Sequence, residues 1–130
     1  MKKLTSLVAI FMLSYIAHAS TDRELATSVS MVALLANPEK LDGKPVIVAG
    51  YVCKDPPRSI GLFLTRSDCI DINYSNAIRL DLSRVKYKIG DGPVLLTVEG
   101  RFESWAHLIH TDEPFFIGQI KVTAMSGRTL

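Results

Sequence analysis

Two cysteines are the residues whose chemistry is most defined in this sequence. Cys53 and Cys69 are the only cysteines among the 130 residues. An even number with neither left over favours a single disulfide, which would stabilise the fold by about 3 kcal/mol through the unfolded state. The alternative is a pair of buried free thiols. A catalytic thiol would need a base placed beside it, and the neighbouring sequence supplies none.

Two histidines form the second group with possible chemistry. His107 and His110 have a His-x-x-His spacing and are followed by Asp112 and Glu113. Zinc takes three or four such ligands in a tetrahedron. Residues three apart share a face on a helix, but this segment falls between two predicted strands. We therefore predict no metal and no cofactor, and keep a metal-binding protein as an alternative to an ordinary polar loop.

Aromatic residues near the histidines suggest a binding surface. Trp105 precedes His107, and Tyr51 lies in the first predicted strand. Aromatic rings can stack on bases, sugars or the side chains of a partner protein. We predict a binding surface for a protein or a small ligand at Tyr51, Trp105, His107 and His110. The alternative is that the rings only close one end of the fold.

Motifs of the common enzyme classes are missing from the sequence. It contains no phosphate-binding loop, no G-x-S-x-G nucleophile elbow and no H-E-x-x-H helix. A serine, a histidine and an aspartate without such a context occur in almost any chain of this size. The sequence therefore predicts a protein that is not an enzyme.

The first 19 residues have the pattern of a secretory signal peptide. Lys2 and Lys3 give a positive start, an apolar run follows, and Ala17-His18-Ala19 provides small residues where signal peptidase needs them. We predict cleavage between Ala19 and Ser20, a periplasmic or secreted location, and one domain at 20–130. The run is shorter than the roughly 20 residues that span a bilayer, so no membrane span is expected after cleavage. An uncleaved anchor is the alternative.

Charge argues against a nucleic-acid partner. Two of the 15 basic residues lie in the predicted signal, which leaves 13 against 13 acidic residues and a formal net charge of zero. The segment Glu103–Glu113 has three acidic residues and no lysine or arginine. Proteins that bind phosphates usually need a basic surface. We expect nucleic acid to be an unlikely partner, with single-stranded nucleic-acid binding kept as an alternative.

Hydrophobic alternation predicts strands over most of the chain, with a helix before them. The helix follows a capping box of Thr21 and Glu24 and has its apolar residues within Leu25–Leu35. Ser28 or Ser30 could cap a second start, so one broken helix and two helical pieces are both possible. Gly50 and Gly100 lie in mid-strand, where glycine usually marks a bend. A small closed barrel with an N-terminal helix follows from this pattern. The predicted strands are Val46–Cys53, Leu62–Leu64, Ile78–Leu82, Leu96–Phe102 and Phe116–Ala124.

Three blocks resemble a family of small exported bacterial proteins, the tRNA-anti-like periplasmic OB-fold proteins. They are Leu34–Tyr51 (LLANPEKLDGKPVIVAGY), Asn76–Leu82 and Val98–Phe102. Leu41 departs from the aromatic residue usual there, and the cysteine pair is no hallmark of the family. The resemblance implies a five-stranded OB-fold-like barrel and a non-enzymatic binding role, and names no substrate.

Overall fold

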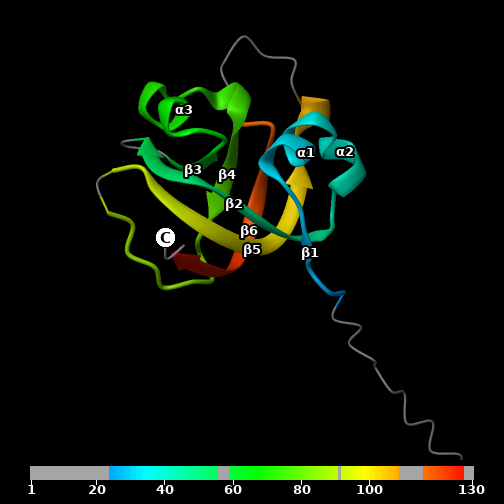
Figure 1. The fold of residues 1–130 in the computed structure, drawn as a ribbon. Coiled ribbons are helices and arrows are strands. Elements are labelled where there is room, and N and C mark those ends of the chain that lie inside the picture. Colours follow the sequence, from blue (N-terminus) through cyan, green and yellow to red (C-terminus); the bar gives the residue numbers. More distant parts are fainter. Residues whose placement is uncertain (1–23, 56–58, 91, 109–115, 128–130) are drawn as a thin grey trace, which may run out of the picture.

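The computed structural model describes residues 24–55, 59–90, 92–108 and 116–127, and its centre is a closed β-barrel (Figure 1). Five strands follow one another around the barrel in the order β2, β3, β4, β6 and β5, and β5 pairs with β2 to close it. This is the strand order of an OB fold, so the predicted mostly-β barrel with a helix before it is confirmed. The elements are β1 (Thr27–Ser28), α1 (Met31–Ala36), α2 (Pro38–Leu41), β2 (Pro45–Asp55), β3 (Ser59–Phe63), α3 (Arg66–Asp71), η1 (Tyr74–Asn76), β4 (Ala77–Asp81), β5 (Val94–Ser104), η2 (Ala106–Leu108) and β6 (Gly118–Gly127).

Strand β2 serves both halves of the barrel. Its residues from Pro45 to Val52 pair with β5, and those from Tyr51 to Asp55 pair with β3. Gly50 lies where the neighbour changes, and an added Cβ there would come within 2.8 Å of the Leu62 side chain. The strand therefore needs a residue without a side chain at the point where it turns from one half of the barrel to the other.

Strand β5 bends at the second predicted glycine. The register between β5 and β6 shifts between Glu99 and Gly100. A Cβ added at Gly100 would strike the backbone carbonyl of Lys121 on β6. Close approach of the two backbones explains why a glycine interrupts an otherwise regular alternation, and the bend predicted at this position is confirmed.

The interior of the barrel is filled by alternate residues of all five strands. Two further parts of the chain add to this core: α1 inserts Met31 and Leu34, and the segment after β4 inserts Ile89. These insertions help to cover the ends of the barrel. The strand residues of the core are Val46, Val48, Val52, Leu62, Ile78, Leu80, Leu96, Val98, Phe102, Ile120 and Val122.

The N-terminal helix is shorter than the sequence predicts. It begins after Ser30, whose side chain accepts a hydrogen bond of 3.1 Å from the N–H of Ala33. Thr27 and Ser28, inside the predicted helix, instead pair with β2 as the short parallel strand β1. Of the two serines predicted to cap a second start, Ser30 is therefore the one that does so, and the predicted first capping residue, Thr21, lies outside the described residues.

Helix α2 is joined to β5 by polar contacts. Pro38 opens it, since a helix's first residue needs no N–H donor. Ser104 on β5 is 1% exposed, and its N–H donates to the Asp42 carboxylate over 2.8 Å. Its hydroxyl lies 3.3 Å from a Glu39 carboxylate oxygen. The buried serine is thereby satisfied by residues of α2 and its C-terminal cap.

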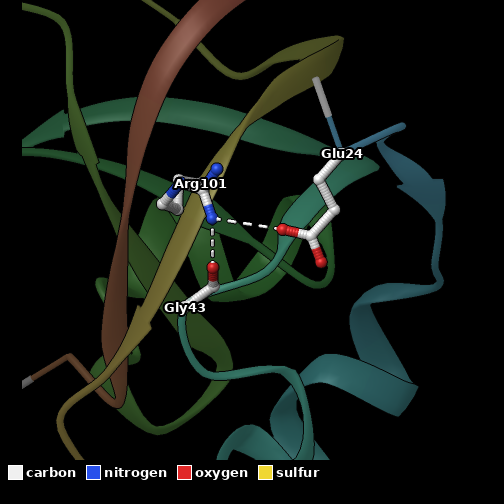
Figure 2. A network of polar contacts seen from close by, with 3 residues as sticks. All are labelled: Glu24, Gly43 and Arg101. Atoms are coloured by element: carbon white, nitrogen blue, oxygen red, sulfur yellow. Dashed lines mark hydrogen bonds and ion pairs between the residues drawn. The ribbon is translucent and has the colours of Figure 1, made fainter. Parts of the chain in front are cut away.

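Arg101 connects β5 to two segments that precede the barrel (Figure 2). Its guanidinium donates to the carbonyl oxygen of Gly43, directly after α2, and forms an ion pair of 3.5 Å with the Glu24 carboxylate. Gly43 has a positive φ of 74°, a conformation that favours glycine.

No helix within the described residues has the length and apolarity needed to cross a bilayer.

Candidate functional site

A second apolar cluster lies on the outer face of the barrel, separate from the interior core. Strand residues alternate between the two sides, so Leu62 points into the barrel while its neighbour Phe63 points outward. We call this second group the outer aromatic cluster. Its buried members are Phe63, Cys69, Ala77 and Phe116, and its half-buried members are Tyr51, Cys53, Ile72, Tyr74 and Trp105.

A glycine on β3 makes room for the two buried rings of this cluster. A Cβ added at Gly61 would lie 2.6 Å from the Phe63 ring and 2.9 Å from the Phe116 ring. Phe116 comes from the connection between β5 and β6, so it reaches the outside of β3 from a distant part of the sequence. The rings thus cover the outer side of β3, which in OB folds belongs to the usual ligand surface.

Helix α3 covers the same face and is joined to β2 by the predicted disulfide. Cys53 on β2 and Cys69 on α3 are bonded, with their Cα atoms 5.8 Å apart. In Figure 1, α3 lies beside β3 and β4 at the end of the barrel that also carries α1 and α2. The disulfide therefore joins the outer cluster to the barrel wall.

Helix α3 begins at a capping residue that the sequence analysis missed. The Thr65 hydroxyl accepts from the Asp68 N–H over 3.0 Å and donates to the Asp68 carboxylate over 2.8 Å. Asn76 and Asn73 also donate to this carboxylate. The hydrogen bond from Thr65, followed by those from the asparagines, lowers the pKa of Asp68. The T-x-x-D spacing of Thr65 and Asp68 is the sequence feature from which this helix could have been predicted.

Helix α3 ends in a strained residue. Ile72 has φ 52° and ψ 55°, the left-handed region. A β-branched residue rarely adopts this conformation, which costs roughly 1–2 kcal/mol. Its side chain is half-buried against the outer aromatic cluster. Packing of this side chain therefore accompanies an unfavourable backbone conformation.

A row of polar side chains borders the cluster across β4, β6 and β5. Arg79 donates to the Gln119 side-chain oxygen over 2.7 Å, and Gln119 donates to Glu103 over 3.1 Å. Glu103 also accepts from the indole N–H of Trp105 over 3.3 Å. The next outward position on β4 is Asp81, whose pKa is lowered by hydrogen bonds from Ser83 and then by Arg79 and Lys121. These contacts fix Trp105 at the border between the apolar cluster and the charged row.

The structure brings two of the four predicted binding residues together. Tyr51 and Trp105 both pack against the outer aromatic cluster. His107 is exposed on η2, and His110 lies outside the described residues, as do Asp112 and Glu113. No group of three or more histidine, cysteine or acidic residues suited to a metal ion occurs in the part of the chain that the structure describes.

Comparisons with known proteins show the fold of this chain. No protein-family model and no curated protein matches the sequence. A chain in the crystal structure of the S. pombe Stn1-Ten1 complex matches with a TM-score of 0.50 and 14% identity, over 81% of this chain and 78% of that one. The telomere capping protein Ten1 of S. pombe matches with a TM-score of 0.49 and 14% identity, over 79% and 81%.

These comparisons correct three predictions made from the sequence. The OB fold is confirmed, but the assignment to an exported bacterial family is not supported, because no family model matches and the matched complex is from S. pombe. The prediction of a periplasmic or secreted location is corrected by the same finding, because the matched complex comes from S. pombe and not from a bacterium. The predicted signal peptide lies outside the described residues. The prediction that nucleic acid is an unlikely partner is also wrong. It rested on the net charge and on the acidic composition of Glu103–Glu113, and neither excludes binding by aromatic stacking, so nucleic acid stays a candidate partner.

Proposed function

We propose that this chain is a non-catalytic OB-fold interaction module that binds a protein partner through the outer aromatic cluster. The observation that carries the proposal is the arrangement of Tyr51, Tyr74 and Trp105, all half-buried, around two fully packed rings. Tyrosine and tryptophan bury a large apolar area and keep a polar group for hydrogen bonding, and they are enriched at protein interfaces. A rigid, preformed surface of this kind also binds with a small loss of conformational entropy.

The charges around the cluster favour a protein over a phosphate backbone. Arg79, the basic residue in the polar row, is already hydrogen-bonded to Gln119, and Glu103 stands in the same row. Because acidic and basic residues balance there, the surface has no uniformly positive potential that would attract phosphates. The matched S. pombe chain was solved as part of a complex of two proteins, which agrees with a module of this fold that binds a protein.

Single-stranded nucleic acid is the second candidate, and the position of the cluster favours it. OB folds bind oligonucleotides on the face of their second and third strands, which here are β3 and β4. Bases stack on aromatic side chains with little regard to sequence. Trp105 and Tyr51 lie on this side of the barrel.

Photo-crosslinking separates the two candidates. A photo-reactive phenylalanine analogue replaces Trp105 in cells, and we expect one heavier adduct that protease removes and nuclease leaves intact. The adduct should weaken when Tyr51→Ala is added. It should not weaken with Tyr87→Ala, because Tyr87 is a tyrosine on the segment between β4 and β5 that does not belong to the cluster. A nuclease-sensitive adduct would favour the second candidate.

Binding in solution provides the independent measurement. Trp105 is the only tryptophan in the chain, so its fluorescence reports directly on this face. The partner identified by crosslinking should change the fluorescence in a saturable way, whereas a thymidine oligonucleotide should leave it unchanged. If no adduct forms, or if Tyr51→Ala leaves the adduct as strong as in the unsubstituted chain, the proposed surface is wrong.

A further inference from the structure

A pocket of about 310 Å³ lies beside the outer aromatic cluster. It is formed by the end of β2, by α3 and by the segment that leads into β5, and its lining includes Cys53, Lys54, Ile70, Ile72, Gly92 and Pro93. Pockets that bind small molecules have volumes of roughly 300–1,000 Å³. The hollow is therefore the right size for a small ligand.

The wall that α3 contributes to this pocket is apolar. Ile70 is 62% exposed although it has a branched aliphatic side chain. Ile72, the next lining residue of the helix, has the strained left-handed backbone described above. Strained residues persist where the surrounding structure fixes them, and they cluster at ligand sites. An apolar molecule in the pocket would cover Ile70 and remove its surface from water.

A positively charged side chain lies beside this apolar wall. Lys54 is the only charged residue among the described residues that line the pocket. Its side chain is exposed, so the ammonium group is accessible to the anionic group of a ligand. We propose that the pocket binds a small apolar carboxylic acid of the fatty-acid type, with its chain against Ile70, Ile72 and Pro93 and its carboxylate at Lys54.

This site is distinct from the surface proposed for the partner. It shares Cys53, Cys69 and Ile72 with the outer aromatic cluster. Tyr51 and Trp105 are not among the residues that line it. Ligand binding in the pocket and partner binding at the aromatic face are therefore measured at different residues. Either proposal can be disproved without disproving the other.

The first experiment titrates the full chain with decanoate, kept below micelle formation, and follows the amide signals by NMR. Saturable shifts are expected at Lys54, Ile70, Ile72 and Gly92. The variant Gly92→Leu should abolish them, because a Cβ at Gly92 meets no atom within 4 Å and the larger side chain can occupy the pocket. Gly127→Leu is the matched control: the same change at a glycine with equally open surroundings at the end of β6 should leave binding intact.

A second pair of measurements tests the predicted orientation. Lys54→Gln should weaken decanoate binding about threefold, as expected for an exposed ion pair, and should leave 1-decanol binding unchanged. Ile70→Ser, an exposed position where folding is not at risk, should weaken both ligands. The proposal is overturned if decanoate causes no saturable shift, if it binds Gly92→Leu as tightly as the unsubstituted chain, or if the shifts lie at Tyr51 and Trp105 instead.

Discussion

The ring of Tyr74 meets the ring of Phe116 edge-on, with centroids 4.9 Å apart and ring planes at 83°. Tyr74 lies on η1, directly before β4, and Phe116 lies two residues before the start of β6. The contact therefore joins two connections of the barrel that are far apart in the sequence. Edge-to-face pairs of this kind contribute about 0.5–1.5 kcal/mol beyond the burial of their area. On the face where OB folds usually bind ligands, this chain therefore has a second, small apolar core.

Phe116→Ala should destabilise the fold by about 3 kcal/mol, because a 6% exposed ring is lost from a packed cluster. Urea unfolding measures the difference in the free energy of unfolding, and the fluorescence of Trp105 should change in the folded state. Leu108→Ala is the control: its side chain is 58% exposed, so the effect should stay within about 0.5 kcal/mol. Equal effects for the two variants would mean that the cluster is not a core.

Gly100→Ala should destabilise the barrel by about 1–3 kcal/mol, since the added methyl group meets the backbone carbonyl of Lys121. The strands must separate at the bulge to accept it. Gly127→Ala places the same methyl group on β6 with no atom within 4 Å and should be nearly neutral. Thermal unfolding of the two variants makes the comparison, and the idea fails if both melt at the same temperature.

Alternation of apolar residues was enough to predict the barrel. Alternate residues are buried from Leu96 to Ser104 in β5 and from Gly118 to Val122 in β6, so a period of two residues appears in both strands and gives their location to within a few residues. The bends at Gly50 and Gly100 could also be predicted, because two backbones approach each other so closely there that only glycine fits. The start of helix α1 was harder to predict from the sequence, because Thr27 and Ser28 fit a helical pattern but pair with β2 instead.

The site was only partly predictable, because its residues come from distant parts of the sequence. Tyr51 and Trp105 were selected for their chemistry, and the fold brings both to one cluster. Phe63 and Tyr74 were missed, since an outward position on a strand gives no indication that another segment will cover it. Helix α3 is too short for a hydrophobic period, and only the Thr65 and Asp68 spacing indicates it. Net charge is a weak guide to the partner, because it averages over surfaces that never meet a ligand.

Reduction of the disulfide should lower the free energy of unfolding by about 3 kcal/mol, as expected for a loop of this length. The bond joins residues 16 positions apart and holds α3 to β2. Urea unfolding with and without dithiothreitol measures the effect. The double variant Cys53→Ala and Cys69→Ala is the control and should not respond to the reductant. A stability that stays constant although mass spectrometry shows free thiols would contradict this account.

Arg101→Leu should cost more stability than Glu24→Gln. Both partners of the ion pair are more than half exposed, so the pair contributes less than about 0.5 kcal/mol and is screened by salt. Arg101 also donates to the Gly43 carbonyl, a bond whose loss costs about 1 kcal/mol. Chemical unfolding at low and high salt separates the two contributions. If salt removes the whole effect of Arg101→Leu, the backbone hydrogen bond contributes nothing.

Asp68 should make the stability of the chain depend on acid pH. Its folded-state pKa lies below the ordinary value of 3.8, chiefly because Thr65 donates to the carboxylate. A lowered pKa means that the unfolded chain binds the proton more readily, so the stabilisation is complete above about pH 4 and is lost as the pH falls through the folded-state pKa. Asp68→Asn should therefore be less stable than the unsubstituted chain at neutral pH, and the difference should shrink on acidification.

Unfolding in urea at a series of pH values measures this difference, and carbon NMR of the carboxyl group gives the pKa of Asp68 directly. Asp71→Asn is the matched control, because Asp71 is an exposed aspartate on the same helix. It lies at the C-terminal end, where the helix dipole disfavours a negative charge, so its replacement should not destabilise the fold. A difference between Asp68→Asn and the unsubstituted chain that persists below the folded-state pKa would show that packing or geometry, and not the charge of the carboxylate, holds the start of α3.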